Sequence, residues 1–85
     1  MSKGEKMFIN KTSDGLNNIS GINIKNKRKE LGISQRELAD RLQIAGLDLD
    51  KNAVQRIECG KRFVTDIEIK FLSAVLNMTF EEILN

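Results

Sequence analysis

Four polar side chains that can hydrogen-bond to nucleic-acid bases fall within six consecutive residues: Lys51, Asn52, Gln55 and Arg56. An asparagine amide can pair with adenine, and arginine or lysine with guanine, each pairing giving roughly 1–3 kcal/mol of discrimination between bases. Asn52 and Arg56 are four residues apart, so on a helix they share one face. The alternative interpretation of this face is the ordinary solvated side of an amphipathic helix.

A helix over residues 51–59, "KNAVQRIEC", is predicted to carry these side chains. Asp50 is placed to cap its first turn, and Gly60 to end it in the left-handed conformation that glycine adopts most easily. Apolar residues recur within it at helical spacing and are expected to face the core: Ala53, Val54 and Ile57.

The preceding helix is predicted to begin at a capping box, "SQRE", in which the Ser34 hydroxyl and the following glutamate satisfy two backbone amides. The connection to the next helix, "QIAGLDL", is long and apolar. One interpretation extends the helix to Ala45, ends it at Gly46, and packs Leu47 and Leu49 against the core.

Three further helices are predicted, which makes the fold all-α with five helices. The first is expected over residues 22–31, with Ser20 as its N-cap and Gly32 after its end. "TDIE" and "TFEE" are capping boxes that start the other two helices at Thr65 and Thr79. Ile24, Arg28 and Leu31 share one face of the first of these helices. In the other two, apolar residues recur at helical spacing and are expected to pack in the core, with Phe71 half-buried: Ile69, Leu72, Val75, Leu76, Phe80, Ile83 and Leu84.

The chain has 85 residues, which suits one domain, and its net charge is +2. Residues 1–19 are polar without a clear period and are predicted to be a flexible arm before a domain at 20–85. Residues 22–62 carry ten Lys/Arg and six Asp/Glu, whereas residues 63–85 carry one Lys and four Asp/Glu. A nucleic-acid-binding face needs such a basic segment, although solvated lysine-rich surfaces are common.

Several function classes are disfavoured by what the sequence lacks. There is no His, no cluster of metal ligands and no glycine-rich phosphate loop, so neither an enzyme, a metal site nor a cofactor is expected. No small-molecule substrate is evident either. The single Cys59 cannot form an internal disulfide, and no apolar run approaches the length of a membrane span. A cytoplasmic protein without a membrane partner is therefore expected.

Two motifs together resemble one known family. "GISQRELA" followed by "VQRIECGKR" is similar to the lambda repressor/Cro-type helix-turn-helix family, also called the xenobiotic-response-element family, and the likeness covers about residues 20–85. It implies a compact five-helix lambda-repressor-like DNA-binding domain. In the family about eleven positions separate the first Leu of the second helix from the inward apolar residue of the third. Here Leu38 and Val54 are sixteen apart, so an extended loop is expected between these helices.

The resemblance also implies roles for individual residues. The helix that starts at Lys51 would lie in the major groove, with base contacts from Lys51, Asn52, Gln55 and Arg56. Glu58 would be a structural acid that binds a basic side chain or a backbone amide. Phosphate contacts are expected from the start of the second helix, from the segment after the third helix, and from the first helix: Ser34, Gln35, Lys61, Arg62 and Arg28.

The predicted function is that of a sequence-specific, double-stranded-DNA-binding transcriptional regulator, most simply a repressor that occupies an operator. A homodimer on a two-fold site is expected, with the "FEEILN" helix as the best candidate for its interface. The alternative is a protein-interaction module of the same fold, such as an antitoxin or adaptor. The sequence leaves open the operator, the regulated genes, and repression versus activation.

Overall fold

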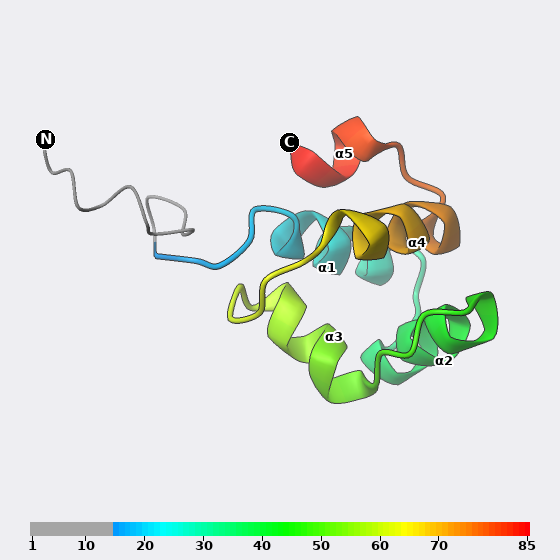
Figure 1. The fold of residues 1–85 in the computed structure, drawn as a ribbon. Coiled ribbons are helices and arrows are strands. Elements are labelled where there is room, and N and C mark those ends of the chain that lie inside the picture. Colours follow the sequence, from blue (N-terminus) through cyan, green and yellow to red (C-terminus); the bar gives the residue numbers. More distant parts are fainter. Residues whose placement is uncertain (1–14) are drawn as a thin grey trace, which may run out of the picture.

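The computed structural model describes residues 15–85, and these residues form five helices and no strand (Figure 1). The predicted all-α, five-helix fold is confirmed. None of these helices combines the length and the apolar run needed to cross a bilayer. In chain order the helices are α1 (Gly21–Glu30), α2 (Gln35–Ala45), α3 (Lys51–Glu58), α4 (Asp66–Leu76) and α5 (Phe80–Leu84).

The three predicted capping boxes are all present, and they explain where α2, α4 and α5 begin. At α2 the Ser34 hydroxyl accepts from the amide of Glu37, while the Glu37 carboxylate accepts from the amide of Ser34. The same reciprocal pairs form at Thr65 with Glu68 and at Thr79 with Glu82. At α3 the Asp50 carboxylate accepts from the amide of Ala53, so this predicted cap is also confirmed. Each cap satisfies backbone donors that the first turn of a helix leaves without partners.

The predicted cap of α1 is wrong. Ser20 has helical backbone angles and its side chain makes no capping hydrogen bond. Asn18 takes that role instead, because its Oδ1 accepts from the amide of Gly21 at 2.8 Å. Gly32 lies after the end of the helix, as predicted: it follows the C-cap residue Leu31 and has a φ of +73°.

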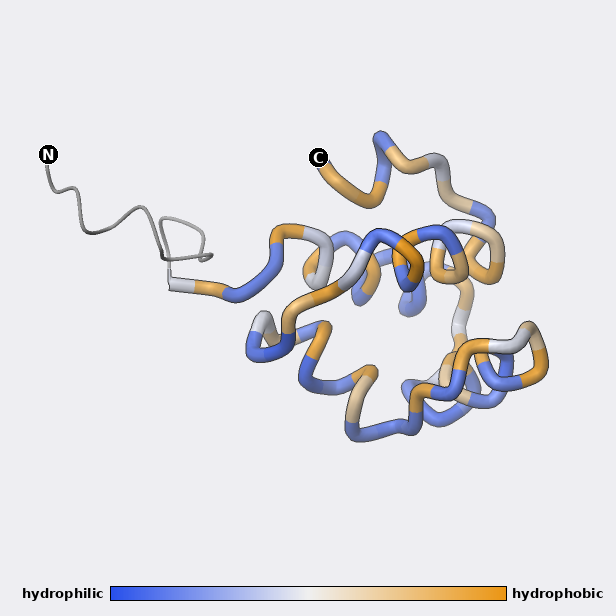
Figure 2. The backbone as a smooth tube through the Cα atoms, in the orientation of Figure 1, coloured by the Kyte–Doolittle hydropathy of each residue, from blue (hydrophilic) through white to orange (hydrophobic). Residues whose placement is uncertain are grey.

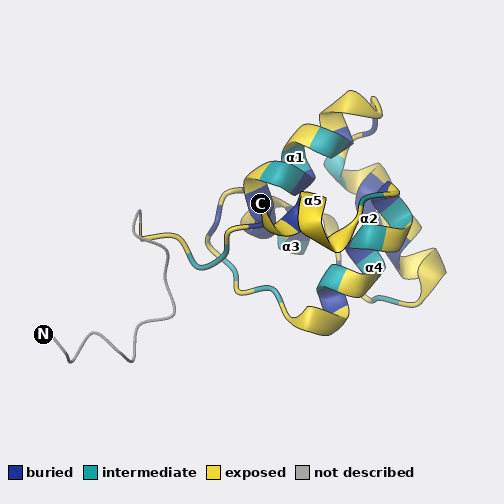
Figure 3. Ribbon diagram, turned by 90° about the horizontal axis from the view of Figure 1, so that it is seen from above, coloured by how far each residue is buried: buried dark blue, intermediate teal, exposed yellow. Residues whose placement is uncertain are grey.

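One apolar core joins all five helices. α1 and α4 pack together in the middle, α5 lies on one side of them, and α2 and α3 lie on the opposite side (Figures 1 and 3). Phe71 is half-buried, as expected. Phe80 and Leu84 were predicted to close the core together with Ile83, but they are 55% and 45% exposed. α5 has only five residues, so Ile83 alone among these three side chains points into the core. The residues that form the core are Ile24, Ile33, Leu38, Ala39, Leu42, Leu49, Val54, Ile57, Leu72, Leu76 and Ile83.

The long connection between α2 and α3 is anchored, as predicted. Gly46 ends α2 with a φ of +115°, and the amide of Leu47 then donates to the carbonyl of Leu42 at 2.8 Å. Leu49 is 6% exposed within the core, and Leu47 packs against the core from its edge. Gln43 holds the connection from α2, because its Nε2 donates to the carbonyl of Leu49 at 2.9 Å.

Part of the predicted arm belongs to the folded domain. Asn17 and Asn18 hydrogen-bond to the backbone between residues 57 and 62, so the ordered unit begins before Ser20. Residues 1–14, the remainder of the arm, lie outside the described residues.

Leu49→Ala should destabilise the domain by about 2–4 kcal/mol, because it removes buried methyl groups and leaves a cavity. Ile44→Ala is the matched control, since Ile44 is 87% exposed and should change stability by no more than about 0.5 kcal/mol. Chemical denaturation followed by circular dichroism measures both. Equal effects of the two substitutions would contradict an anchored connection.

Candidate nucleic-acid interface

α3 presents the four candidate base-contacting side chains together on its solvent side. Lys51, Asn52, Gln55 and Arg56 are all exposed, while Val54 and Ile57 on the opposite side are 1% exposed each. Figure 2 shows the matching alternation of hydrophilic and hydrophobic stretches along α3. The polar face is thus held rigidly by a buried apolar face, as a groove-binding helix requires.

A polar groove lies between this face of α3 and the exposed side of α2. The sequence analysis gave no binding role to the α2 side chains in it: Arg36 and Ala39 lie within the "GISQRELA" motif and Asp40 and Gln43 follow it, but no pattern marks any of them as a contact. The residues that line the groove are Arg36, Ala39, Asp40, Gln43, Asp50, Lys51 and Asn52.

The two side chains at the start of α2 that were predicted to contact phosphate already make hydrogen bonds within the protein. Ser34 is exposed, but its hydroxyl already accepts from the amide of Glu37. Gln35 is half-buried, and its Nε2 donates to Oε1 of Glu58 at 3.0 Å. One amide hydrogen of Gln35 is therefore committed to the protein, and only the second is available to a ligand.

Arg28 and Glu58 form a buried ion pair between α1 and α3. Arg28 Nε donates to Glu58 Oε2 at 2.6 Å and Arg28 Nη2 to Glu58 Oε1 at 3.0 Å. Arg28 Nη1 also donates to the carbonyl of Ile33 at 2.8 Å. The hydrogen bonds to Glu58 raise the pKa of Arg28 above its ordinary value, even though burial opposes this.

This geometry corrects one expectation and confirms another. Arg28 is 8% exposed and its guanidinium is occupied by protein acceptors, so its prediction as a phosphate contact is wrong. Glu58 binds a basic side chain, which confirms its predicted structural role.

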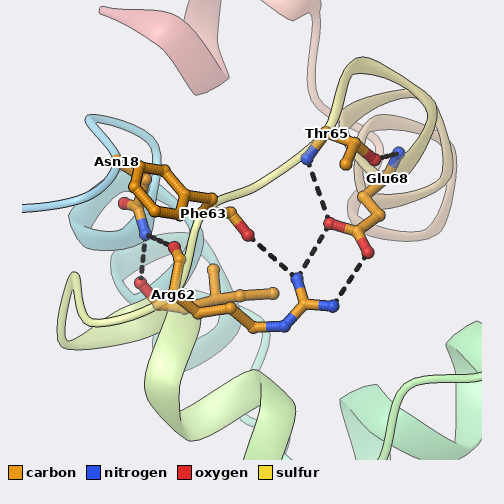
Figure 4. Close-up of polar contacts among 6 residues, drawn as sticks. Asn18, Arg62, Phe63, Thr65 and Glu68 are labelled. Atoms are coloured by element: carbon orange, nitrogen blue, oxygen red, sulfur yellow. Dashed lines mark hydrogen bonds and ion pairs between the residues drawn. The ribbon is translucent and has the colours of Figure 1, made fainter. Parts of the chain in front are cut away.

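The two cations after α3 have different surroundings. Lys61 is exposed, whereas Arg62 is half-buried and forms a two-point ion pair with Glu68, at 2.9 and 3.0 Å (Figure 4). This pairing raises the pKa of Arg62 and, with the Thr65 hydrogen bonds, lowers the pKa of Glu68. A phosphate would have to compete with Glu68 for Arg62, so Lys61 is the better placed of the two.

The comparisons with known proteins agree with this arrangement. A family model described as helix-turn-helix matches residues 24–83. The chain belongs to the helix-turn-helix family. Its resemblance to the lambda repressor/Cro type is thereby confirmed, and membership makes it a DNA-binding regulator of transcription.

Two solved structures illustrate the helix-turn-helix likeness. The restriction-modification controller protein C.AhdI from Aeromonas hydrophila is 28% identical, with a TM-score of 0.65, over 74% of this chain and 84% of that one. The hypothetical transcription factor NHTF from Neisseria is 23% identical, with a TM-score of 0.71, over 87% of this chain and 79% of that one, and it supports the fold alone. No curated protein matches the sequence.

Within this helix-turn-helix, Glu58→Leu should destabilise the domain by about 3 kcal/mol, because it leaves the buried Arg28 cation without its carboxylate. The double variant Arg28→Met/Glu58→Leu removes both charges and should recover much of that loss. Thermal and urea unfolding of the two variants and the wild type measure the difference. A double variant as unstable as the single one would show that Arg28 is not the reason for the loss.

Proposed function

We propose that the chain is a sequence-specific double-stranded-DNA-binding regulator that places α3 in the major groove. The observation that carries the proposal is the face of α3 on which Lys51, Asn52, Gln55 and Arg56 are exposed together beside a buried apolar face. Asn52 and Arg56 supply the amide and guanidinium groups that pair with adenine and guanine. Lys51 and Gln55 flank them on the same helix.

The DNA backbone would be held on both sides of α3. Lys61 follows the helix; its backbone is hydrogen-bonded to Arg56 and Asn17, and its side chain is exposed. Ser34 and Gln35 lie at the start of α2, where the helix dipole favours an anion, and the second amide hydrogen of Gln35 can donate to it. Each phosphate contact should add about 0.9 to the steepness of log affinity against log salt on B-DNA.

The regulator would act by occupying an operator in the cytoplasm, which for a repressor means blocking polymerase. The similar structure of C.AhdI, a restriction-modification controller protein, supports a regulatory role. No catalytic step belongs to this mechanism.

Replacing both base-contact candidates, Asn52→Ala with Arg56→Ala, should weaken specific binding by about 2–6 kcal/mol and leave the fold intact, because both side chains are exposed. A site is first selected from random duplexes, and affinities are then measured by fluorescence anisotropy at several salt concentrations. Lys70→Ala on α4 is the matched control, since it removes an exposed cation away from this face and should change affinity little.

The results separate the candidate functions. If the wild type binds no selected duplex more tightly than random DNA, the proposal of a sequence-specific regulator is contradicted. An unchanged DNA affinity in the Asn52/Arg56 variant, with loss of a protein partner in pull-down, would favour the protein-interaction module.

We also propose that the active form is a homodimer on a two-fold operator, with recognition helices about 34 Å apart. One eight-residue helix reaches few base pairs, so a second copy would supply the remaining contacts. The α5 end of the domain suits this partner, because exposed Phe80 and Leu84 border an apolar depression shared with Val64 and Ile69. A two-fold interface places the same patch on both subunits.

Phe80→Lys should shift the protein towards monomer, because it places like charges in the shared patch of a two-fold interface. Ile67→Lys is the control, since Ile67 is 65% exposed but borders a different depression on α4. Sedimentation velocity over a concentration series measures both variants. A wild type that stays monomeric with and without operator DNA would contradict the dimer.

A further inference from the structure

The side chain of Asn18 joins three parts of the domain that are distant in the sequence. Its Oδ1 accepts from the amide of Gly21 at the start of α1. Its Nδ2 donates to the carbonyl of Ile57 in the last turn of α3, at 3.0 Å, and to the carbonyl of Arg62 beyond that helix, at 2.8 Å (Figure 4). Both side-chain amide hydrogens of Asn18 are thus bonded to carbonyls at the two ends of residues 57–62, the segment that carries Lys61.

The neighbours of Asn18 reinforce this attachment. The amide of Asn17 donates to the carbonyl of Gly60 at 2.8 Å, and its Nδ2 donates to the carbonyl of Lys61 at 3.0 Å. Gly21 lets the chain come this close, because a Cβ at that position would lie 2.1 Å from the carbonyl oxygen of Ile57. Residues 17–21 therefore cross the end of α3, held there by one backbone hydrogen bond and by three hydrogen bonds from the side chains of Asn17 and Asn18.

The same segment is held from its other side by α4. Arg62 is paired with Glu68, and its Nη1 also donates to the carbonyl of Phe63 at 3.0 Å. Arg62 is consequently fixed through its carbonyl by Asn18 and through its guanidinium by Glu68 (Figure 4). Lys61 lies between these attachments with its backbone held and its side chain exposed.

We propose that Asn18 is a positioning residue for DNA binding, which holds residues 60–62 so that Lys61 meets a backbone phosphate while α3 occupies the major groove. The proposal rests on the proposed function, because it gives Asn18 a role in the same interface. Asn18 is half-buried and bonds to backbone carbonyls on both sides of Lys61, so it need not touch DNA itself. Its contribution is to order the loop before the complex forms, which removes an entropic cost from binding.

A double-mutant cycle tests this role. Asn18→Ala and Lys61→Ala are made singly and together, and affinity for the selected duplex is measured against salt, at a temperature where every variant is folded. If Asn18 acts through Lys61, each single variant should lower the steepness of the salt dependence by up to about 0.9, and the double variant should lose little more.

Asn23→Ala is the matched control. Its side-chain amide also donates to a backbone carbonyl, that of Ile83 at 2.8 Å, but it ties α1 to α5 and not to α3. Asn23→Ala should therefore leave the salt dependence of DNA binding unchanged, even if it lowers stability as much as Asn18→Ala. When it is combined with Lys61→Ala, the effects of the two substitutions on affinity should be additive.

Hydrogen exchange of the Gly60 and Lys61 amides gives a readout that needs no DNA. These amides donate to Ile57 and Arg56 carbonyls, and Asn18→Ala should speed their exchange, whereas Asn23→Ala should not. If the wild type binds DNA but Asn18→Ala and Asn23→Ala have the same exchange rates or the same salt dependence, the positioning role is overturned and the proposed function stands. A wild type that binds no duplex overturns the proposed function and the positioning role together.

Discussion

The buried contact between Arg28 and Glu58 is the constraint on which the placement of α3 depends. Two charges removed from water must satisfy each other closely, which leaves α1 and α3 little freedom to shift. Arg28 also reaches the carbonyl of Ile33 before α2, and Glu58 accepts from Gln35 within α2. A single charged centre therefore sets the mutual positions of α1, α2 and α3.

Some cationic side chains in this chain bind protein groups, while their neighbours in the sequence face solvent. Arg28 is inside the protein, although lysines precede and follow it on the same helix. Arg62 is tied to α4, while the adjacent Lys61 faces solvent. A planar guanidinium can bind a carboxylate at two points and also reach a carbonyl, so arginine suits these interior positions better than lysine.

Features determined by local backbone chemistry could be predicted from sequence. The capping boxes at Ser34, Thr65 and Thr79 each involve residues three apart, so the pattern and the contact coincide. Features that depend on distant partners could not. Asn18 caps α1 because α3 holds it in place, and a polar stretch in the sequence gives no sign of a partner 39 residues away. Phe80 and Leu84 follow a helical period, but only the shortness of α5 decides that both remain outside.

The anchored connection between α2 and α3 has a consequence for how this domain can diversify. Leu49 sits in the core immediately before Asp50, so the starting point of α3 is set from inside the protein. Insertions or deletions around Gly46 and Asp48 would change the outline of the loop without moving that starting point. Because the four exposed polar side chains of α3 contribute nothing to the core, the length of the loop and the residues on this face of α3 can vary separately over the same packed core.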